Sequence, residues 1–212
     1  MNAPRLVEVA PERLDGWVER FSTAHGEVSR SCDRGTSPSS WELAAADGSW
    51  ARLTGWQEAE DPSWPRPPVL LVVLVRRGGY AVALVSEAGE LVAHKVGTRH
   101  VQSRTAAGGW SQQRYARRRG NQADALVEAV AGHGARVLEE GETRLGRRAA
   151  GLVLGGDRSL AGQTLDMLAA GNLRRVLEVP RRELWDLPDP RRAVLDDAVR
   201  SGRAVRVEVR NA

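Results

Sequence analysis

A continuous apolar run in the middle of the chain places the strongest limit on its fold. Val69–Val75 contains only valine and leucine, and a second apolar segment, Tyr80–Ser86, follows the turn at Arg77-Gly78-Gly79. Runs of this length and composition are typical of strands buried on both faces of a sheet. This run, the longest in the chain, is also far too short to cross a membrane. We therefore expect a central sheet that is covered by helices.

The elements after this run predict the order of that sheet. A third strand, Glu90–Gly97, completes an antiparallel meander, and a helix is expected from about Asn121 to His133-Gly134. Strands and helices then alternate, and the expected segments are Gly151–Leu154 (strand), Asp157–Ala170 (helix), Leu173–Val179 (strand), Asp189–Arg200 (helix) and Ala204–Val209 (strand). The predicted class is α+β or α/β, with a mixed sheet in which a three-strand meander precedes αβαβ, the order found in ribonuclease-H-like folds.

The strand-to-helix connection Gly155-Gly156-Asp157 is a candidate phosphate-binding loop, because glycine-rich turns can hold phosphates. It lacks the spacing of the known phosphate-binding loops, so we expect an ordinary turn with Asp157 at the N-cap.

The first 66 residues predict a separate small unit. Pro11–His25 has apolar residues at helical spacing, and Ser39–Trp56 predicts a hairpin that turns at Asp47-Gly48. We expect the tryptophans at 17, 41, 50, 56 and 64 to build its core. A proline-rich connector at 61–68 gives two domains, 1–66 and 67–212. The acidic residues near the N-terminus argue against an export signal, so we expect a cytoplasmic protein.

The charge of the chain is concentrated in one window. The formal net charge is +4, yet residues 91–123 contain no acid and carry +7, which leaves −3 for all other residues. A basic segment in an otherwise mildly acidic protein is typical of a site that binds a polyanion. We therefore expect this window to contact nucleic acid.

At the centre of this window is a long loop, expected at 98–120. Its segment Arg104–Gln122 has no carboxylate, histidine or cysteine, and so lacks a conventional general base, nucleophile or metal ligand. Paired glycines at 108 and 109 allow close approach of the backbone to a ligand, and the amides of Gln112 and Gln113 can orient a water molecule. We expect neither a metal nor a cofactor.

This loop resembles the catalytic loop of peptide-chain release factors, which carry a Gly-Gly-Gln tip. The closer resemblance is to the Vms/ANKZF-type release factors of ribosome quality control, whose tip is a glycine, two variable residues and a glutamine. Gly109-Trp110-Ser111-Gln112 fits that spacing, and Arg117-Arg118-Arg119 with Asn121 resembles the family's arginine-pair and asparagine stretch. Residues 69–209 are covered by the resemblance, and the alanine, glycine and arginine bias suits an actinobacterial member.

The resemblance implies the fold of the middle domain of eukaryotic and archaeal class I release factors, and a peptidyl-tRNA hydrolase that acts on stalled large ribosomal subunits. Its partners would be peptidyl-tRNA and ribosomal RNA, without a membrane, and we expect a monomer. The catalytic segment would comprise Gly108, Gly109, Gln112 and Gln113, with either glutamine positioning the water. The expected RNA-binding residues are Arg99, Arg104, Trp110, Arg114, Arg117, Arg118, Arg119 and Asn121.

Two alternatives remain open from the sequence. The loop could only dock, which would make the protein a non-catalytic RNA- or ribosome-binding module. The second alternative is a metal-dependent nuclease, because ribonuclease-H-like folds often hold metals between carboxylates. The three meander strands contain Glu90 as their only acid, which disfavours the nuclease.

Overall fold

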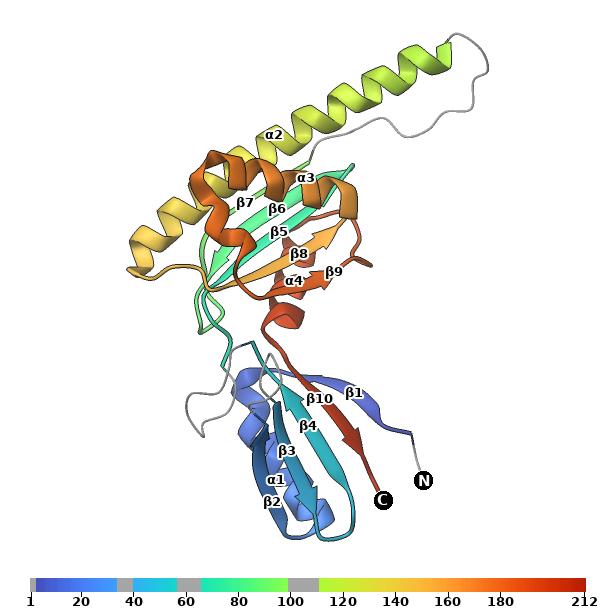
Figure 1. The fold of residues 1–212 in the computed structure, drawn as a ribbon, viewed down its shortest axis with the longest axis vertical. Coiled ribbons are helices and arrows are strands. Elements are labelled where there is room, and N and C mark those ends of the chain that lie inside the picture. Colours follow the sequence, from blue (N-terminus) through green and yellow to red (C-terminus); the bar gives the residue numbers. More distant parts are fainter. Residues whose placement is uncertain (1–2, 34–39, 57–65, 99–110) are drawn as a thin grey trace. The chain divides into compact units, whose positions relative to one another are not determined.

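The computed structural model describes residues 3–33, 40–56, 66–98 and 111–212, and these form two compact units (Figure 1). The first comprises Met1–Pro68 together with Arg200–Ala212, and the second comprises Val69–Val199. Helices and strands occur in both units, which confirms the expected mixed α+β class. The chain leaves the first unit and returns to it, so the second unit is an insertion.

The sheet of the second unit has the strand order β7-β6-β5-β8-β9. The apolar run forms β5 (Leu70–Arg76), which pairs antiparallel with β6 (Gly79–Val85), and β6 pairs antiparallel with β7 (Leu91–Thr98). On the other side of β5 the sheet continues with β8 (Gly151–Gly156) and β9 (Arg181–Leu184), both parallel to it. The predicted meander is therefore confirmed.

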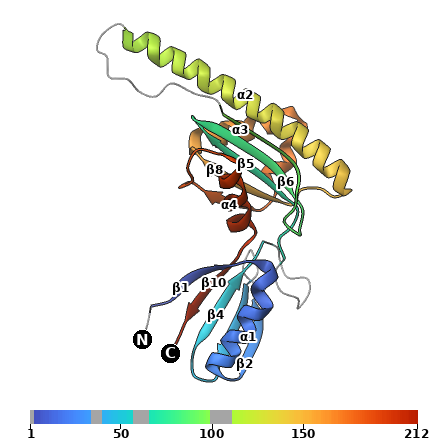
Figure 2. The same ribbon diagram turned by 180° about the vertical axis from the view of Figure 1, so that it is seen from behind.

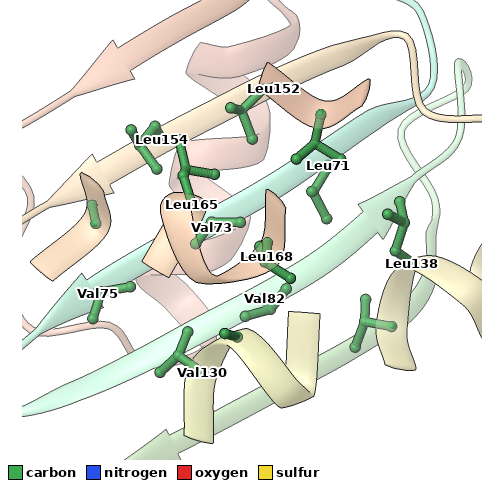
Figure 3. Close-up of a cluster of buried hydrophobic side chains, with 14 of the residues drawn as sticks. Leu71, Val73, Val75, Val82, Val130, Leu138, Leu152, Leu154, Leu165 and Leu168 are labelled. Atoms are coloured by element: carbon green, nitrogen blue, oxygen red, sulfur yellow. The ribbon is translucent and has the colours of Figure 1, made fainter. Parts of the chain in front are cut away.

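Helices lie on both faces of this sheet. Helices α2 (Ser111–Leu145) and α3 (Arg158–Leu168) cover one face, whereas α4 (Arg192–Arg203) lies on the opposite face (Figures 1 and 2). Figure 3 shows the core under α2 and α3, where Val73 and Val82 of the sheet meet Val130 and Leu165 of the helices. Every residue of Leu70–Val75 is at most 1% exposed, because both faces are covered.

Helix α2 is much longer than expected, with 35 residues instead of a helix that ends at His133-Gly134. Gly134 lies inside α2 and does not end it. The absence of a side chain at this position makes room for α3. A Cβ at Gly134 would lie 3.2 Å from Leu168 Cδ2, and one at Gly141 would lie 2.5 Å from Leu84 Cδ2. The helix ends before Gly146, whose φ of 64° is the left-handed conformation that terminates helices.

The predicted strand at Leu173–Val179 is wrong. The chain there forms a π-helical turn, Ala169–Leu173, and a 3-10 turn, Arg174–Leu177. Arg175 donates to both carboxylate oxygens of Glu142 in α2 at 2.7 and 2.6 Å, and Val176 is buried. These tertiary contacts hold the segment helical, and the strand begins only after Pro180.

In the first unit, a helix packs on one face of a second sheet with the order β1-β10-β4-β3-β2. The predicted helix and hairpin are confirmed as α1 (Leu14–His25), preceded by a 3-10 turn, and as β3 (Ser40–Ala45) and β4 (Trp50–Thr54). Strands β1 (Arg5–Val9) and β2 (Val28–Asp33) were not expected. Trp41 and Trp56 are 2% and 4% exposed and belong to the interior, whereas Trp64 lies outside the described residues.

The last strand, β10 (Val205–Arg210), lies in this first sheet between β1 and β4, so its expected place in the second sheet is wrong. Its sequence alternates valine with charged residues, and its burial alternates with the same period. An alternating strand suits a sheet with one covered face, whereas the strands of the second unit need cover on both. The segment 200–212 therefore belongs with the first unit rather than with the expected domain 67–212.

Candidate catalytic loop and nucleic-acid interface

The candidate loop connects the end of β7 at Thr98 to the start of α2 at Ser111. Gly108, Gly109, Trp110, Arg99 and Arg104 lie between these elements, outside the described residues. The expected loop at 98–120 is too long at its C-terminal end, because residues 111–120 are helical. The connection that carries the glycines is thus about half as long as the sequence indicated.

The other candidate residues lie in the first turns of α2. Gln112 and Gln113 follow directly after the first helical residue, and Arg114, Arg117, Arg118 and Arg119 come next. Positions 114, 117, 118 and 121 recur at the spacing that places residues on one side of a helix. Asn121 is exposed.

The N-terminal part of α2 extends past the sheet (Figure 1). Among the described side chains of α2, Ala123 is the first that packs against the core, and Leu126 is the first that is fully buried. Gln112 precedes Ala123 by eleven positions, which is about 16 Å along a helix axis. The helix thus carries the two glutamines well away from the domain core.

A buried aromatic residue, Tyr80, holds together the two elements from which the loop departs. Its ring stacks on His133 of α2 with centroids 5.2 Å apart and planes 15° apart. The same ring lies against Gly97 of β7, where a Cβ would be 2.5 Å from Tyr80 Cζ and Oη. The sequence analysis missed this contact, since only the fold brings residues 80, 97 and 133 together.

The ends of several strands meet where the loop departs. Thr98 pairs with Gly79, so the loop begins beside the β5–β6 hairpin. β5 and β8 are parallel, and both reach this same edge at Val75 and Gly156. We call it the carboxyl edge, and it comprises Arg76–Gly79, Gly97–Thr98, Gly155–Arg158 and residues 185–191.

The turn between β8 and α3 at the carboxyl edge has the expected structure. Asp157 accepts hydrogen bonds from the backbone N–H groups of Ser159 at 3.0 Å and Leu160 at 3.2 Å. Gly156 has a φ of 96°, and a Cβ there would lie 2.3 Å from the carbonyl oxygen of Val75. The prediction of an N-capped strand-to-helix turn is confirmed, and glycine is required at this position.

Two further observations on the described residues concern metal binding and membrane association. Among the residues that the structure describes, there is no group of three or more histidine, cysteine, aspartate and glutamate side chains that could hold a metal ion. In the same residues, no helix has the length and apolar character that a membrane crossing requires.

Comparison with known proteins adds a family assignment to this geometry. Residues 68–208 match a family model described as "Actinobacteria/chloroflexi VLRF1 release factor". The match covers the inserted unit, the whole connection from β7 to α2, and most of β10. No curated protein matches the chain.

Proposed function

Because the chain belongs to the VLRF1 release factors of Actinobacteria and Chloroflexi, and thus has a release-factor role in translation, we propose that it is a peptidyl-tRNA hydrolase acting on stalled large ribosomal subunits. Its substrate is the ester between the nascent peptide and the terminal ribose of the tRNA. The residue proposed to position the attacking water is Gln112, with Gln113 as the alternative.

The proposed reaction is a hydrolysis in which the glutamine orients water and the leaving group is the ribose hydroxyl. The water oxygen attacks the ester carbonyl, and the developing oxyanion needs hydrogen-bond donors. As this intermediate collapses, the ester C–O bond breaks and the ribose oxygen takes up a proton, which leaves a free peptide carboxylate. Such a reaction depends on positioning and oxyanion stabilisation more than on a strong base. An amide side chain with no titratable group suits this role.

The start of α2 at Ser111 supports the proposal further. The first N–H groups of a helix have no partner within the helix, and the helix dipole favours negative charge there. The glutamines at 112 and 113 are therefore beside backbone donors that an oxyanion or a phosphate would accept. The predicted start of this helix was near Asn121, eight residues after Gln113.

The single observation that carries the proposal is the position of Gln112. It stands at the N-terminus of α2, about 16 Å along the helix axis from Ala123, the first described side chain of α2 that packs on the core, and inside a window of residues 91–123 with seven basic side chains and no acid. Such a projecting, basic element is suited to enter a site enclosed by RNA, where the arginines contact phosphates and give orientation.

The test is peptide release from large subunits that carry peptidyl-tRNA. We expect wild-type protein to release the peptide and Gln112→Ala to lower the rate by about 10²–10³, the effect of losing one positioning group. Gln113→Ala is measured separately, and if it alone abolishes release, the catalytic role belongs to Gln113.

The matched control is Gln163→Ala, which removes an exposed glutamine from α3 and should leave release unchanged. Equal release by wild type and both loop variants would exclude the glutamine mechanism. Binding to subunits with no release by the wild-type protein would instead support the non-catalytic RNA-binding module.

A further inference from the structure

The carboxyl edge brings together basic residues that are far apart in the sequence. The loop after β9 crosses to the β5–β6 hairpin, since Arg76 donates to the carbonyl oxygen of Leu187 and a Cβ at Gly78 would meet the carboxylate of Asp189. Leu187 also reaches Gly155, which is next to the start of α3. These contacts make the edge one continuous surface, and the candidate loop departs from it at Thr98.

Most acids on and beside this edge already have partners within the protein. The carboxylate of Asp157 caps α3, and that of Asp189 lies 3.5 Å from Nε of Arg76. Glu183 accepts a hydrogen bond from Nε1 of Trp185 at 3.1 Å. Asp186 is the one other acid among the described residues of this edge.

Three exposed arginines lie on the edge, Arg77, Arg158 and Arg191, and the first two flank the β5–β6 hairpin and the start of α3. Arg77 is exposed at the tip of the β5–β6 hairpin, and Arg158 is the exposed first residue of α3. Within the residues that the structure describes, neither forms an ion pair with a carboxylate. The guanidinium of Arg158 instead lies over the ring of Trp185, 5.1 Å from its centroid.

The position of Arg158 is electrostatically unfavourable for the isolated protein. A cation in the first turn of a helix is opposed by the positive end of the helix dipole. The contact with Trp185 offsets this cost and holds the guanidinium at the edge. An external anion would pair with the guanidinium group of Arg158, whereas the N–H groups of Ser159 and Leu160 already donate to Asp157.

We propose that Arg77 and Arg158, the latter held by Trp185, bind phosphates of the RNA that the neighbouring loop engages, and so extend the RNA interface across the carboxyl edge. This inference rests on the proposed function for its choice of RNA. The partner is RNA because the edge adjoins the window 91–123, which contains no acid and carries +7. Arginine binds phosphate with its planar, forked donors.

The test is the salt dependence of binding, measured with the full chain and two probes, deacylated tRNA and isolated large ribosomal subunits. Each phosphate contact contributes about 0.7–0.9 to the slope of log affinity against log salt. We expect Arg77→Gln and Arg158→Gln each to lower the slope by this amount and to weaken binding about five- to eightfold at 0.1 M salt. A change with only one probe identifies whether tRNA or ribosomal RNA supplies the phosphates.

The matched control is Arg148→Gln, because Arg148 is equally exposed but precedes β8 at the opposite end of the sheet. Slopes of the edge variants equal to that of the control would overturn the inference, as would failure of the wild type to bind either probe. Reduced slopes with release unaffected by the Gln112 and Gln113 substitutions would refute the glutamine mechanism alone. Glutamine-dependent release with unchanged slopes would refute the edge interface alone.

Discussion

Two glycines in the same helix should respond in opposite directions to the same substitution. A Cβ at Gly132 of α2 would meet no heavy atom within 4 Å. A Cβ at Gly141, nine residues later, would lie 2.5 Å from Cδ2 and 2.8 Å from Cβ of Leu84. Leu84 is 0% exposed on β6, an interior strand of the sheet, and its Cβ cannot rotate away. Alanine is therefore accommodated at the first position and obstructed at the second.

The expected changes in the free energy of unfolding follow from two opposing effects. Alanine in a helix interior is favoured over glycine by about 1 kcal/mol, which should appear in full for Gly132→Ala. Overpacking a well-filled core costs about 1–3 kcal/mol, and the rigid contact with Leu84 places Gly141→Ala toward the upper end. We expect Gly132→Ala to stabilise the protein by about 1 kcal/mol and Gly141→Ala to destabilise it by about 1–2 kcal/mol.

Urea denaturation followed by circular dichroism at 222 nm measures both changes, because α2 is the longest helix and dominates the helical signal. Peptide release by Gly132→Ala should remain at the wild-type level, since Gly132 is exposed and an added Cβ would meet none of the described residues outside its own helix. If the two variants shift the midpoint of urea denaturation in the same direction, the reasoning is refuted, because the close approach of α2 to β6 would then not be the reason for glycine at position 141.

Three further predictions concern the loop attachment, the α3 cap and the first unit. Gly97→Ala should destabilise the protein by about 1–3 kcal/mol in urea denaturation, because its Cβ would collide with the buried ring of Tyr80. Asp157→Ala should cost about 1 kcal/mol in the same assay through loss of the N-cap. The backbone N–H of Ser49 and the adjacent His25 lower the pKa of Asp47, so its contribution to stability is present above its ordinary pKa of 3.8 and is lost as the pH falls through the lowered value. Melting temperatures measured from about pH 5 downward should therefore fall less steeply for Asp47→Ala than for the wild type.

Local patterns were sufficient where the residues themselves determine the structure. The apolar run at Val69–Val75 predicts a strand covered on both faces, and Asp157 after two glycines predicts a capped helix. The helix terminus at His133-Gly134 was wrong for a physical reason: a glycine that ends a helix and one that makes room for a neighbouring helix have the same sequence signal. Gly134 makes room for Leu168, and only the packing of α2 against α3 reveals it.

Some features of the candidate site could likewise be predicted from local sequence patterns, whereas others could not. The meander, the acid-free basic window and the glycine- and glutamine-containing segment could be predicted from the residues alone, because hydrophobic pattern and charge are local properties of the chain. The folded structure was needed to find that residues 111–120 continue α2, that Tyr80 joins Gly97 to His133, and that the last strand returns to the first sheet. The last two features depend on contacts between residues up to two hundred positions apart, and such contacts arise only when the whole chain is packed.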